Sequence, residues 1–123
     1  NPPGRTTAAV EWLADELRAG SAPGLVDDQW HTPTTVADAA ASLRWLTTAS
    51  VTGTVHVASP TPTTKYALGR RIARRLGFDP DRLSRLSADT LDWTAERPRR
   101  ATLSSVRPDD RGVEPTRLIP ADG

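Results

Sequence analysis

Cysteine and methionine are both absent from this sequence of 123 residues. A chain without cysteine forms no disulfide, binds no metal through thiolates and has no cysteine nucleophile. The absence fits a reducing compartment, and we predict a cytoplasmic protein. Because the chain begins at Asn1 and contains no methionine, we expect residues 1–123 to be one domain of a longer protein.

An excess of charge of one sign is missing as well, because 16 basic residues face 15 acidic ones and the net charge is +1. This balance argues against a nucleic-acid partner. No apolar run approaches the roughly 20 residues that a membrane helix needs, so we expect a soluble protein without a membrane partner. Four arginines of the segment "GRRIARRLG" are interpreted as an exposed helix face: Arg70, Arg71, Arg74 and Arg75.

Three stretches of the chain have the apolar period of an amphipathic helix. The first covers residues 6–19 and ends at Gly20, the second begins at Thr35, and the third ends at Leu76 before Gly77. Glycine is suited to the left-handed conformation that closes a helix. The predicted apolar stripes are Val10, Leu13, Ala14 and Leu17; Val36, Ala39, Ala40, Leu43 and Leu46; and Tyr66, Gly69, Ala73 and Leu76.

Hydroxyl residues predict where the second and third helices begin. The Thr35 hydroxyl can accept a hydrogen bond from the backbone N–H of Asp38, in a carboxylate variant of the capping box, and Thr63 or Thr64 can cap the third helix. Short strands are expected between the helices, at residues 24–28, 53–59 and 82–87. Alternating helices and strands predict an α/β fold. Because its sheet is small, we expect this chain to pack against another domain.

Five short motifs follow one another along the chain. "DQWHTPT" (residues 28–34) resembles a D-Q-x-G-x-P-T loop, and "TVADAAASLRWL" is similar to the helix that follows that loop. "GTVHVAS" resembles a G-x-Y-H-x-A-G strand, "TTKYALGRRI" an S-W-Y-x-F-A-x-x-I helix, and "AERPRRATL" an A-x-R-P-x-x-S-x-L segment. In this order the motifs resemble the dTDP-4-dehydrorhamnose reductases and related sugar-nucleotide reductases of the extended short-chain dehydrogenase/reductase superfamily.

The resemblance implies the C-terminal, substrate-binding portion of such an enzyme, with three main helices and a small sheet. The family's nucleotide-binding Rossmann half has a glycine-rich fingerprint, which this sequence lacks. The intact protein is thereby expected to be an NAD(P)-dependent 4-ketoreductase that transfers hydride to a 4-keto-6-deoxy sugar of a nucleoside diphosphate. NADPH or NADH would be bound by the missing half. That half, in the same chain or in a separate subunit, and the sugar nucleotide are the expected partners.

The family's catalytic Tyr-x-x-x-Lys pair is absent too. The only tyrosine is Tyr66, with Arg70 four residues later. An arginine there could lower a tyrosine pKa, but Tyr66 lies on the apolar stripe of its helix and matches a structural tyrosine of the family. We therefore interpret Tyr66 as structural, assign no catalytic residue to this chain and expect it to be inactive alone.

Five residues are the predicted substrate contacts, namely Gln29, Thr32, Pro33, Thr34 and Arg97. Gln29 can donate and accept at once, the two threonines offer hydroxyls to a sugar, and Pro33 would hold the turn. Arg97 can pair with a diphosphate oxygen. Two alternatives stay open: the loop residues satisfy backbone groups and cap a helix, and Arg97 is a solvated arginine.

Neither histidine is assigned a catalytic role. His31 occupies the usual glycine position of the family's loop, which favours an alternative function, a non-catalytic regulatory or scaffolding module derived from the reductases. A separately encoded small protein that completes a nucleotide-binding chain is a third possibility. His56 matches a family histidine and is interpreted as a packing residue. The two histidines have no spacing typical of a metal site, so no metal is expected.

Overall fold

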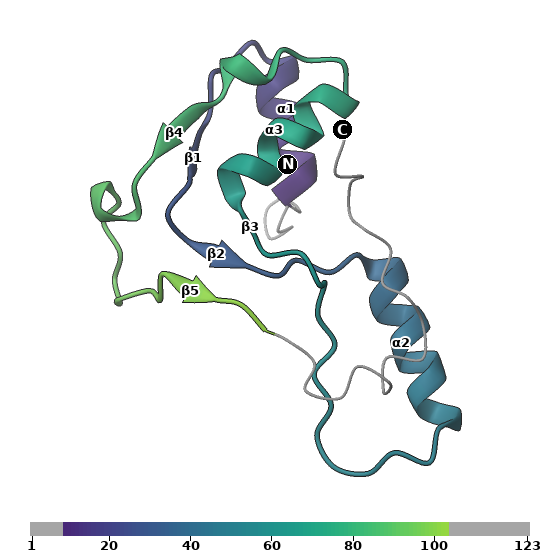
Figure 1. Ribbon diagram of the computed structural model, residues 1–123. Helices are drawn as coiled ribbons and strands as arrows, with labels where there is room; N and C mark the ends of the chain where they lie inside the picture. Colours follow the sequence, from purple (N-terminus) through teal and green to yellow (C-terminus); the bar gives the residue numbers. More distant parts are fainter. Residues whose placement is uncertain (1–8, 104–123) are drawn as a thin grey trace. The chain divides into compact units, whose positions relative to one another are not determined.

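The computed structural model describes residues 9–103. Backbone contacts divide these residues into two compact units. Among the described residues, the first unit consists of residues 9–28 and Thr64–Glu96, and the second of Gln29–Thr63 and residues 97–103. The chain thus leaves the first unit after Asp28, returns to it at Thr64 and leaves it again after Glu96 (Figure 1). The loop predicted to contact substrate begins the second unit.

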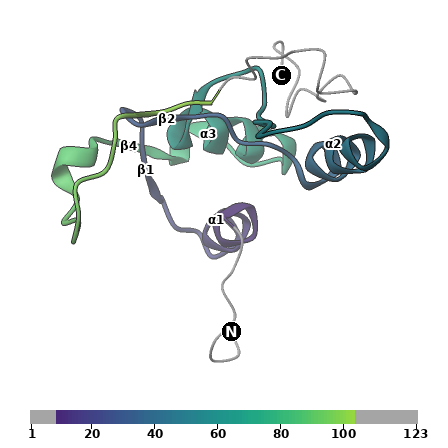
Figure 2. The same ribbon diagram turned by 90° about the horizontal axis from the view of Figure 1, so that it is seen from below.

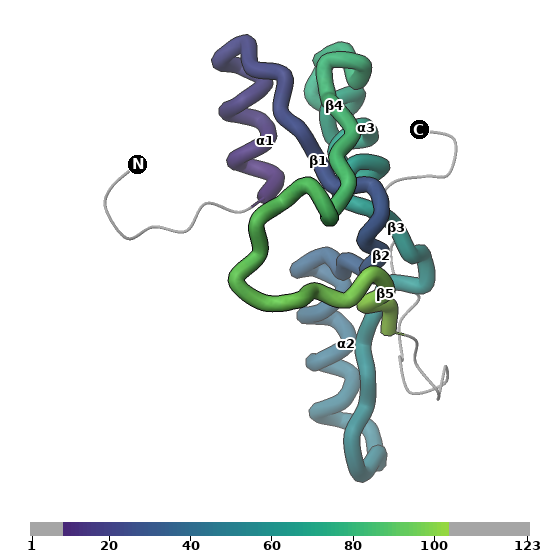
Figure 3. Tube along the Cα trace, turned by 90° about the vertical axis from the view of Figure 1, so that its left-hand side faces the viewer, coloured from purple at the N-terminus to yellow at the C-terminus, as the bar shows by residue number. Residues whose placement is uncertain are grey.

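The first unit pairs two helices with a two-stranded parallel sheet. The strands β1 and β4 run side by side, with Leu25 in register with Arg85 (Figure 3). This confirms the strands expected in residues 24–28 and 82–87, in shorter form. The elements of this unit are α1 (Ala9–Arg18), β1 (Gly24–Val26), α3 (Lys65–Arg75), β4 (Ser84–Leu86) and two short 3-10 helices, η1 (Pro80–Arg82) and η2 (Ala88–Thr90).

An apolar core holds the first unit together. Its fully enclosed members are Leu13, Leu17, Ala73 and Leu83, so α1, α3 and the segment before β4 meet there. The predicted stripe of α1 is confirmed at Leu13, Ala14 and Leu17, whereas Val10 is half exposed. α3 packs closely because Gly69 has no side chain: a Cβ there would collide with Leu25.

Both helix ends predicted in the first unit are confirmed. Gly20 and Gly77 have φ angles of 85° and 81°, in the left-handed region that glycine adopts without strain. After α3 the backbone N–H of Phe78 donates to the carbonyl of Ala73 at 2.9 Å, which closes the Schellman motif. Phe78 also packs against the core. Thr64 caps the start of α3, where its hydroxyl accepts from the N–H of Ala67 at 3.1 Å.

The second unit contains one long helix and a pair of very short strands. Its elements are β2 (Trp30–His31), α2 (Val36–Thr48) and β5 (Arg100–Ala101), and β3 (Thr63–Thr64) spans the boundary between the units. β2 and β5 pair in parallel, with Trp30 opposite Arg100. As predicted, Thr35 caps α2, since its hydroxyl accepts from the N–H of Asp38 at 3.0 Å. Figure 2 looks along the axis of α2.

Burial on α2 is the reverse of the prediction. The helix buries Asp38 and Ser42, whereas Val36 is 87% exposed and Leu43 is 62% exposed. The stripe was therefore assigned correctly as a helical pattern. As a buried face it is wrong at Val36, Ala40 and Leu43, which are exposed, while Ala39 and Leu46 are half-buried.

The strand predicted at residues 53–59 is wrong. This segment has no strand pairing in the described structure, although Val55 and Val57 alternate with Thr54 and His56. Alternation shows only that a segment suits a sheet, and a strand exists only where a neighbouring backbone completes its hydrogen bonds. Here the segment ends instead with the N–H of Ser59 donating to the Thr34 hydroxyl at 3.1 Å.

Candidate functional site

The loop between β2 and α2 is anchored to two other segments of the second unit through its threonines. The Thr34 hydroxyl accepts from the N–H of Ser59, and the Thr32 hydroxyl accepts from the N–H of Leu103 at 3.1 Å. Each hydroxyl retains its own hydrogen, which it can donate to a ligand. Both threonines and Pro33 are half-buried, so the loop is held in place with its polar atoms near the surface.

Gln29 differs from its neighbours because its amide has no partner within residues 9–103. The residue is half-buried at the start of the second unit, directly before β2. An amide that offers both a donor and an acceptor, and that is not used by the fold, is suited to a sugar hydroxyl or a nucleobase edge. Among the predicted loop contacts, Gln29 is the residue that the described structure leaves available.

Asp28 has a structural role instead. Its carboxylate accepts from the Ser87 hydroxyl at 2.6 Å and from the N–H of Ala88 at 2.8 Å, so it fastens the start of η2 within the first unit. The indole N–H of Trp93 donates to the carbonyl of Ala88 at 3.0 Å on the same turn. The alternative interpretation, in which Asp28 satisfies backbone groups, is thus correct for this residue. Adjacent Asp28 and Gln29 belong to different units.

Arg97 is exposed and lies three residues before β5. The pairing of β2 with β5 brings its segment beside the loop, because the N–H of Trp30 donates to the carbonyl of Arg99 at 2.8 Å. Segments that carry Gln29 and Arg97 are therefore neighbours in the same unit, although the two residues are 68 positions apart in sequence. Ligand contact by Arg97 stays a prediction.

The two histidines of the second unit differ in burial. His31 is half-buried in β2, where its backbone is extended, and within residues 9–103 no residue other than glycine has a positive φ. An extended conformation suits any residue, so a histidine fits here without backbone strain. His56 is exposed, which corrects its interpretation as a packing residue. No group of three histidine, cysteine, aspartate or glutamate side chains suited to a metal occurs within residues 9–103.

Tyr66 belongs to a polar cluster at the edge of the first core. Arg70 donates to the Tyr66 hydroxyl at 3.3 Å and to the Asp81 carboxylate at 2.8 Å, while Arg85 stacks 4.9 Å from the ring centroid. The hydrogen bonds to Asp81 and then to Tyr66 raise the pKa of Arg70 above its ordinary value, so this guanidinium remains charged. The cluster fixes the ring against the core, in agreement with a structural tyrosine.

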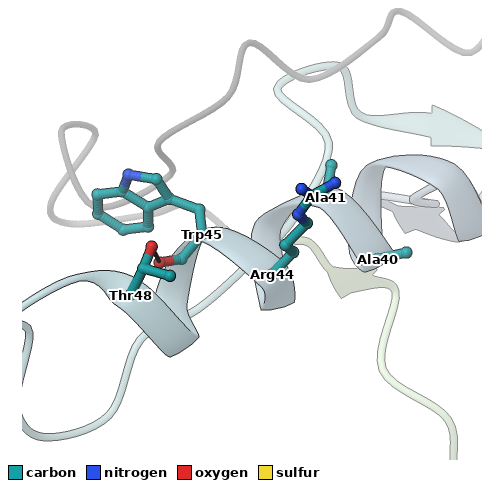
Figure 4. A pocket seen from close by; sticks show the side chains of 5 residues that line it. All are labelled: Ala40, Ala41, Arg44, Trp45 and Thr48. Carbon is teal, nitrogen blue, oxygen red and sulfur yellow. Dashed lines mark hydrogen bonds between the residues drawn. The ribbon is translucent and has the colours of Figure 1, made fainter.

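A shallow pocket lies along α2 in the second unit (Figure 4). Trp45 and Thr48 lie together at one end, and Arg44 and Ala41 at the other. Thr48 uses its hydroxyl to donate to the carbonyl of Trp45 at 3.0 Å, so the hydrogen of that hydroxyl is already in use. Sequence reasoning missed this pocket. Its one signal was Trp45, a large aromatic residue that lies off the predicted apolar stripe of its helix.

The described elements and the anchored loop define a small α/β domain. Residues 7–117 match a family model described as the RmlD substrate binding domain, so the chain belongs to this family. The match confirms the resemblance drawn from the five motifs and the predicted α/β class. Within residues 9–103, none of the helices has the length and apolar character needed to cross a membrane.

Two curated relatives are more than 30% identical to this chain over the aligned residues. A probable low-salt glycan biosynthesis reductase of Haloferax volcanii is 36% identical over 93 residues, which make up 76% of this chain and 31% of the relative. A dTDP-4-keto-6-deoxy-D-glucose reductase of Streptomyces niveus is 33% identical over 93 residues, 76% of this chain and 32% of the relative. The match thus spans about a third of either relative.

Two solved structures share the fold. A dTDP-4-dehydrorhamnose reductase from Bacillus anthracis, in complex with NADP, has a TM-score of 0.79 at 18% identity over 90% of this chain and 40% of that one. A dTDP-4-dehydrorhamnose reductase from Yersinia enterocolitica has a TM-score of 0.75 at 20% identity over 94% of this chain and 40% of that one. The remainder of those proteins has no counterpart in these 123 residues.

Proposed function

We propose that this chain is the substrate-binding part of an NAD(P)-dependent sugar-nucleotide 4-ketoreductase. The observation that carries the proposal is the half-buried Gln29, whose amide is unused within residues 9–103, beside an anchored loop with two hydroxyls. Family membership and the activities named for both curated relatives support it. Gln29, Thr32, Pro33, Thr34 and Arg97 would orient the sugar nucleotide.

The chemistry would take place on a nucleotide-binding half that these residues do not include. A 4-ketone accepts hydride on carbon and a proton on oxygen, and the sequence holds neither a Tyr-x-x-x-Lys pair nor a glycine-rich fingerprint. NADPH or NADH would supply the hydride from that half. Residues 1–123 would act as one substrate-binding domain and would be inactive alone, because positioning accelerates a reaction only where the reacting groups are present.

Exposed features of the second unit support a partner half. α2 presents Val36 and Leu43 to solvent, and residues 53–59 have a strand pattern without a strand partner. Exposed apolar side chains mark surfaces that another body covers, and an unpaired strand pattern marks a place where a sheet can continue. A nucleotide-binding half that contributes the neighbouring strand would satisfy both.

The alternative function is a non-catalytic regulatory or scaffolding module of the same family. It was favoured by His31 in place of the family's glycine. Because His31 lies in an extended strand, the substitution imposes no backbone strain on the loop. The alternative therefore loses its main support. An assay can still distinguish a module without activity from a reductase.

The test is an assay of this chain joined to its nucleotide-binding half. With NADPH and a dTDP-4-keto-6-deoxy sugar, the complete protein is expected to oxidise the cofactor, whereas the chain alone is not. Oxidation by the chain alone would overturn the division of roles. If the complete protein bound the sugar nucleotide without oxidising NADPH, the regulatory function would replace the reductase.

A further inference from the structure

Trp30 and Arg100 form an unexpected pair on the short sheet of the second unit. They are in register on the parallel strands β2 and β5, which lie side by side in Figure 1. Side chains in register on neighbouring strands project to the same face, and such strands are about 4.8 Å apart. The sequence gives no local sign of this pair, because 70 positions separate the two residues.

Neither side chain is used by the described structure. Trp30 is 40% exposed and Arg100 is exposed, and neither side chain makes a hydrogen bond, ion pair or ring contact within residues 9–103. Arginines elsewhere in the chain are engaged with rings, as Arg82 is with Phe78 at 5.7 Å and Arg85 with Tyr66 at 4.9 Å. The indole and the guanidinium share one face of the sheet without stacking on each other. Both groups are therefore available to a ligand.

We propose that Trp30 and Arg100 form a subsite for a nucleoside diphosphate, with the base stacked on the indole and a phosphate oxygen bound by the guanidinium. Stacking on an aromatic side chain suits any nucleobase, and the arginine fork matches phosphate oxygens. The subsite rests on the function proposed above, because a sugar nucleotide carries a nucleoside diphosphate.

The backbone around the pair is already fixed, which reduces the conformational entropy lost on binding. The N–H of Trp30 donates to the carbonyl of Arg99, and two residues after β5 the N–H of Leu103 donates to the Thr32 hydroxyl. Gln29 directly precedes Trp30, and its amide is unused within the part of the chain that the structure describes. The same short sheet therefore presents an aromatic face, a cation and a neighbouring amide.

A nucleoside diphosphate also occurs in NADPH, so the experiment must separate the two sources. Calorimetric titrations of the complete protein would use dTDP, thymidine and NADP⁺. The Trp30→Ala change is expected to weaken binding of dTDP and thymidine roughly tenfold, and Trp30→Phe to weaken it less. Arg100→Gln should weaken dTDP binding about fivefold and leave thymidine unchanged, because thymidine has no phosphate.

Matched controls are available in the first unit. Trp12 is 41% exposed and Arg75 is exposed, so Trp12→Ala and Arg75→Gln remove similar side chains away from the pair and should leave every titration unchanged. An effect of the Trp30 and Arg100 changes confined to NADP⁺ would support the subsite and assign it to the cofactor. Wild-type binding of both dTDP and NADP⁺ by both variants would overturn it.

The two proposals fail separately. If the complete protein bound dTDP through Trp30 but reduced no sugar nucleotide, the reductase function would be wrong and the subsite would stand. If it reduced a sugar nucleotide with unchanged KM values for both substrates in Trp30→Ala and Arg100→Gln, the function would stand and the subsite would be wrong.

Discussion

The two units of this chain bury opposite kinds of residue. In the first, Leu13 and Leu17 are enclosed by neighbouring elements of the same unit. In the second, α2 encloses Asp38 and Ser42 and leaves Val36 and Leu43 in solvent. A unit with its own apolar core can be stable by itself, whereas one that exposes its apolar stripe gains little from hydrophobic burial. Under the proposed function, the second unit is therefore the one that a nucleotide-binding half would cover.

The largest expected effect separates the two helix stripes. Leu17→Ala removes a side chain that is 1% exposed and should lower the free energy of unfolding of the chain by about 2–5 kcal/mol. Leu43→Ala removes one that is 62% exposed and should change it by no more than about 0.5 kcal/mol. Denaturant unfolding of both variants measures this contrast, and equal losses would show that the two stripes are buried alike.

A charge on the exposed stripe tests whether a partner half covers it. Leu43→Lys should leave the stability of this chain unchanged but destabilise the complete protein by about 2 kcal/mol, because the ammonium would be buried there without a partner. Lys65→Leu is a control for altered surface charge, since Lys65 is exposed on the first unit. Equal melting temperatures of the complete protein with and without Leu43→Lys would contradict the proposal that a partner half covers this stripe.

The helix caps give a smaller contrast. Thr64 is 1% exposed, and its hydroxyl both caps α3 and donates to Asp27 at 2.7 Å. Thr64→Val should therefore cost about 2 kcal/mol, since a cap and a bond to a carboxylate are lost together. Thr35 is half-buried at the start of α2, and Thr35→Val should cost only about 1 kcal/mol. Thermal unfolding of the two variants would show whether that order holds.

The smallest expected effect concerns a surface ion pair. Arg85 and Asp27 lie 3.0 Å apart, and the arginine side chain is 69% exposed. Arg85→Ala should cost less than about 1 kcal/mol and less still in high salt, because water and ions screen the pair. Unfolding measured at low and high salt tests this, and a loss above about 1 kcal/mol that does not depend on salt would show that the stacking of Arg85 on Tyr66 outweighs the ion pair.

Local signals were sufficient to predict most of the first unit. Thr64 and Gly77 mark the ends of α3 by their own chemistry, and the period of Leu13 and Leu17 identifies the buried face of α1. The second unit was predicted less well because its strands depend on distant partners. Residues 53–59 have the alternating pattern of a strand but pair with no other strand in the described structure. No local signal in the sequence tells whether such a neighbouring strand exists.

The candidate site shows the same limit. Gln29, Thr32, Pro33 and Thr34 were identified by their resemblance to a family loop, which a match over residues 7–117 supports. The bond between Thr34 and Ser59 joins residues 25 positions apart and was invisible in the sequence. It shows that the Thr34 hydroxyl holds the loop in place, so Gln29 is the sharper test of binding.

The KM of the complete protein for a dTDP-4-keto-6-deoxy sugar, compared between wild type and Gln29→Ala, tests the central claim most directly. Loss of one or two hydrogen bonds to the substrate should raise this KM about fivefold to tenfold, with the KM for NADPH unchanged as the internal reference. An unchanged KM for the sugar nucleotide would contradict the assignment of this loop to the substrate.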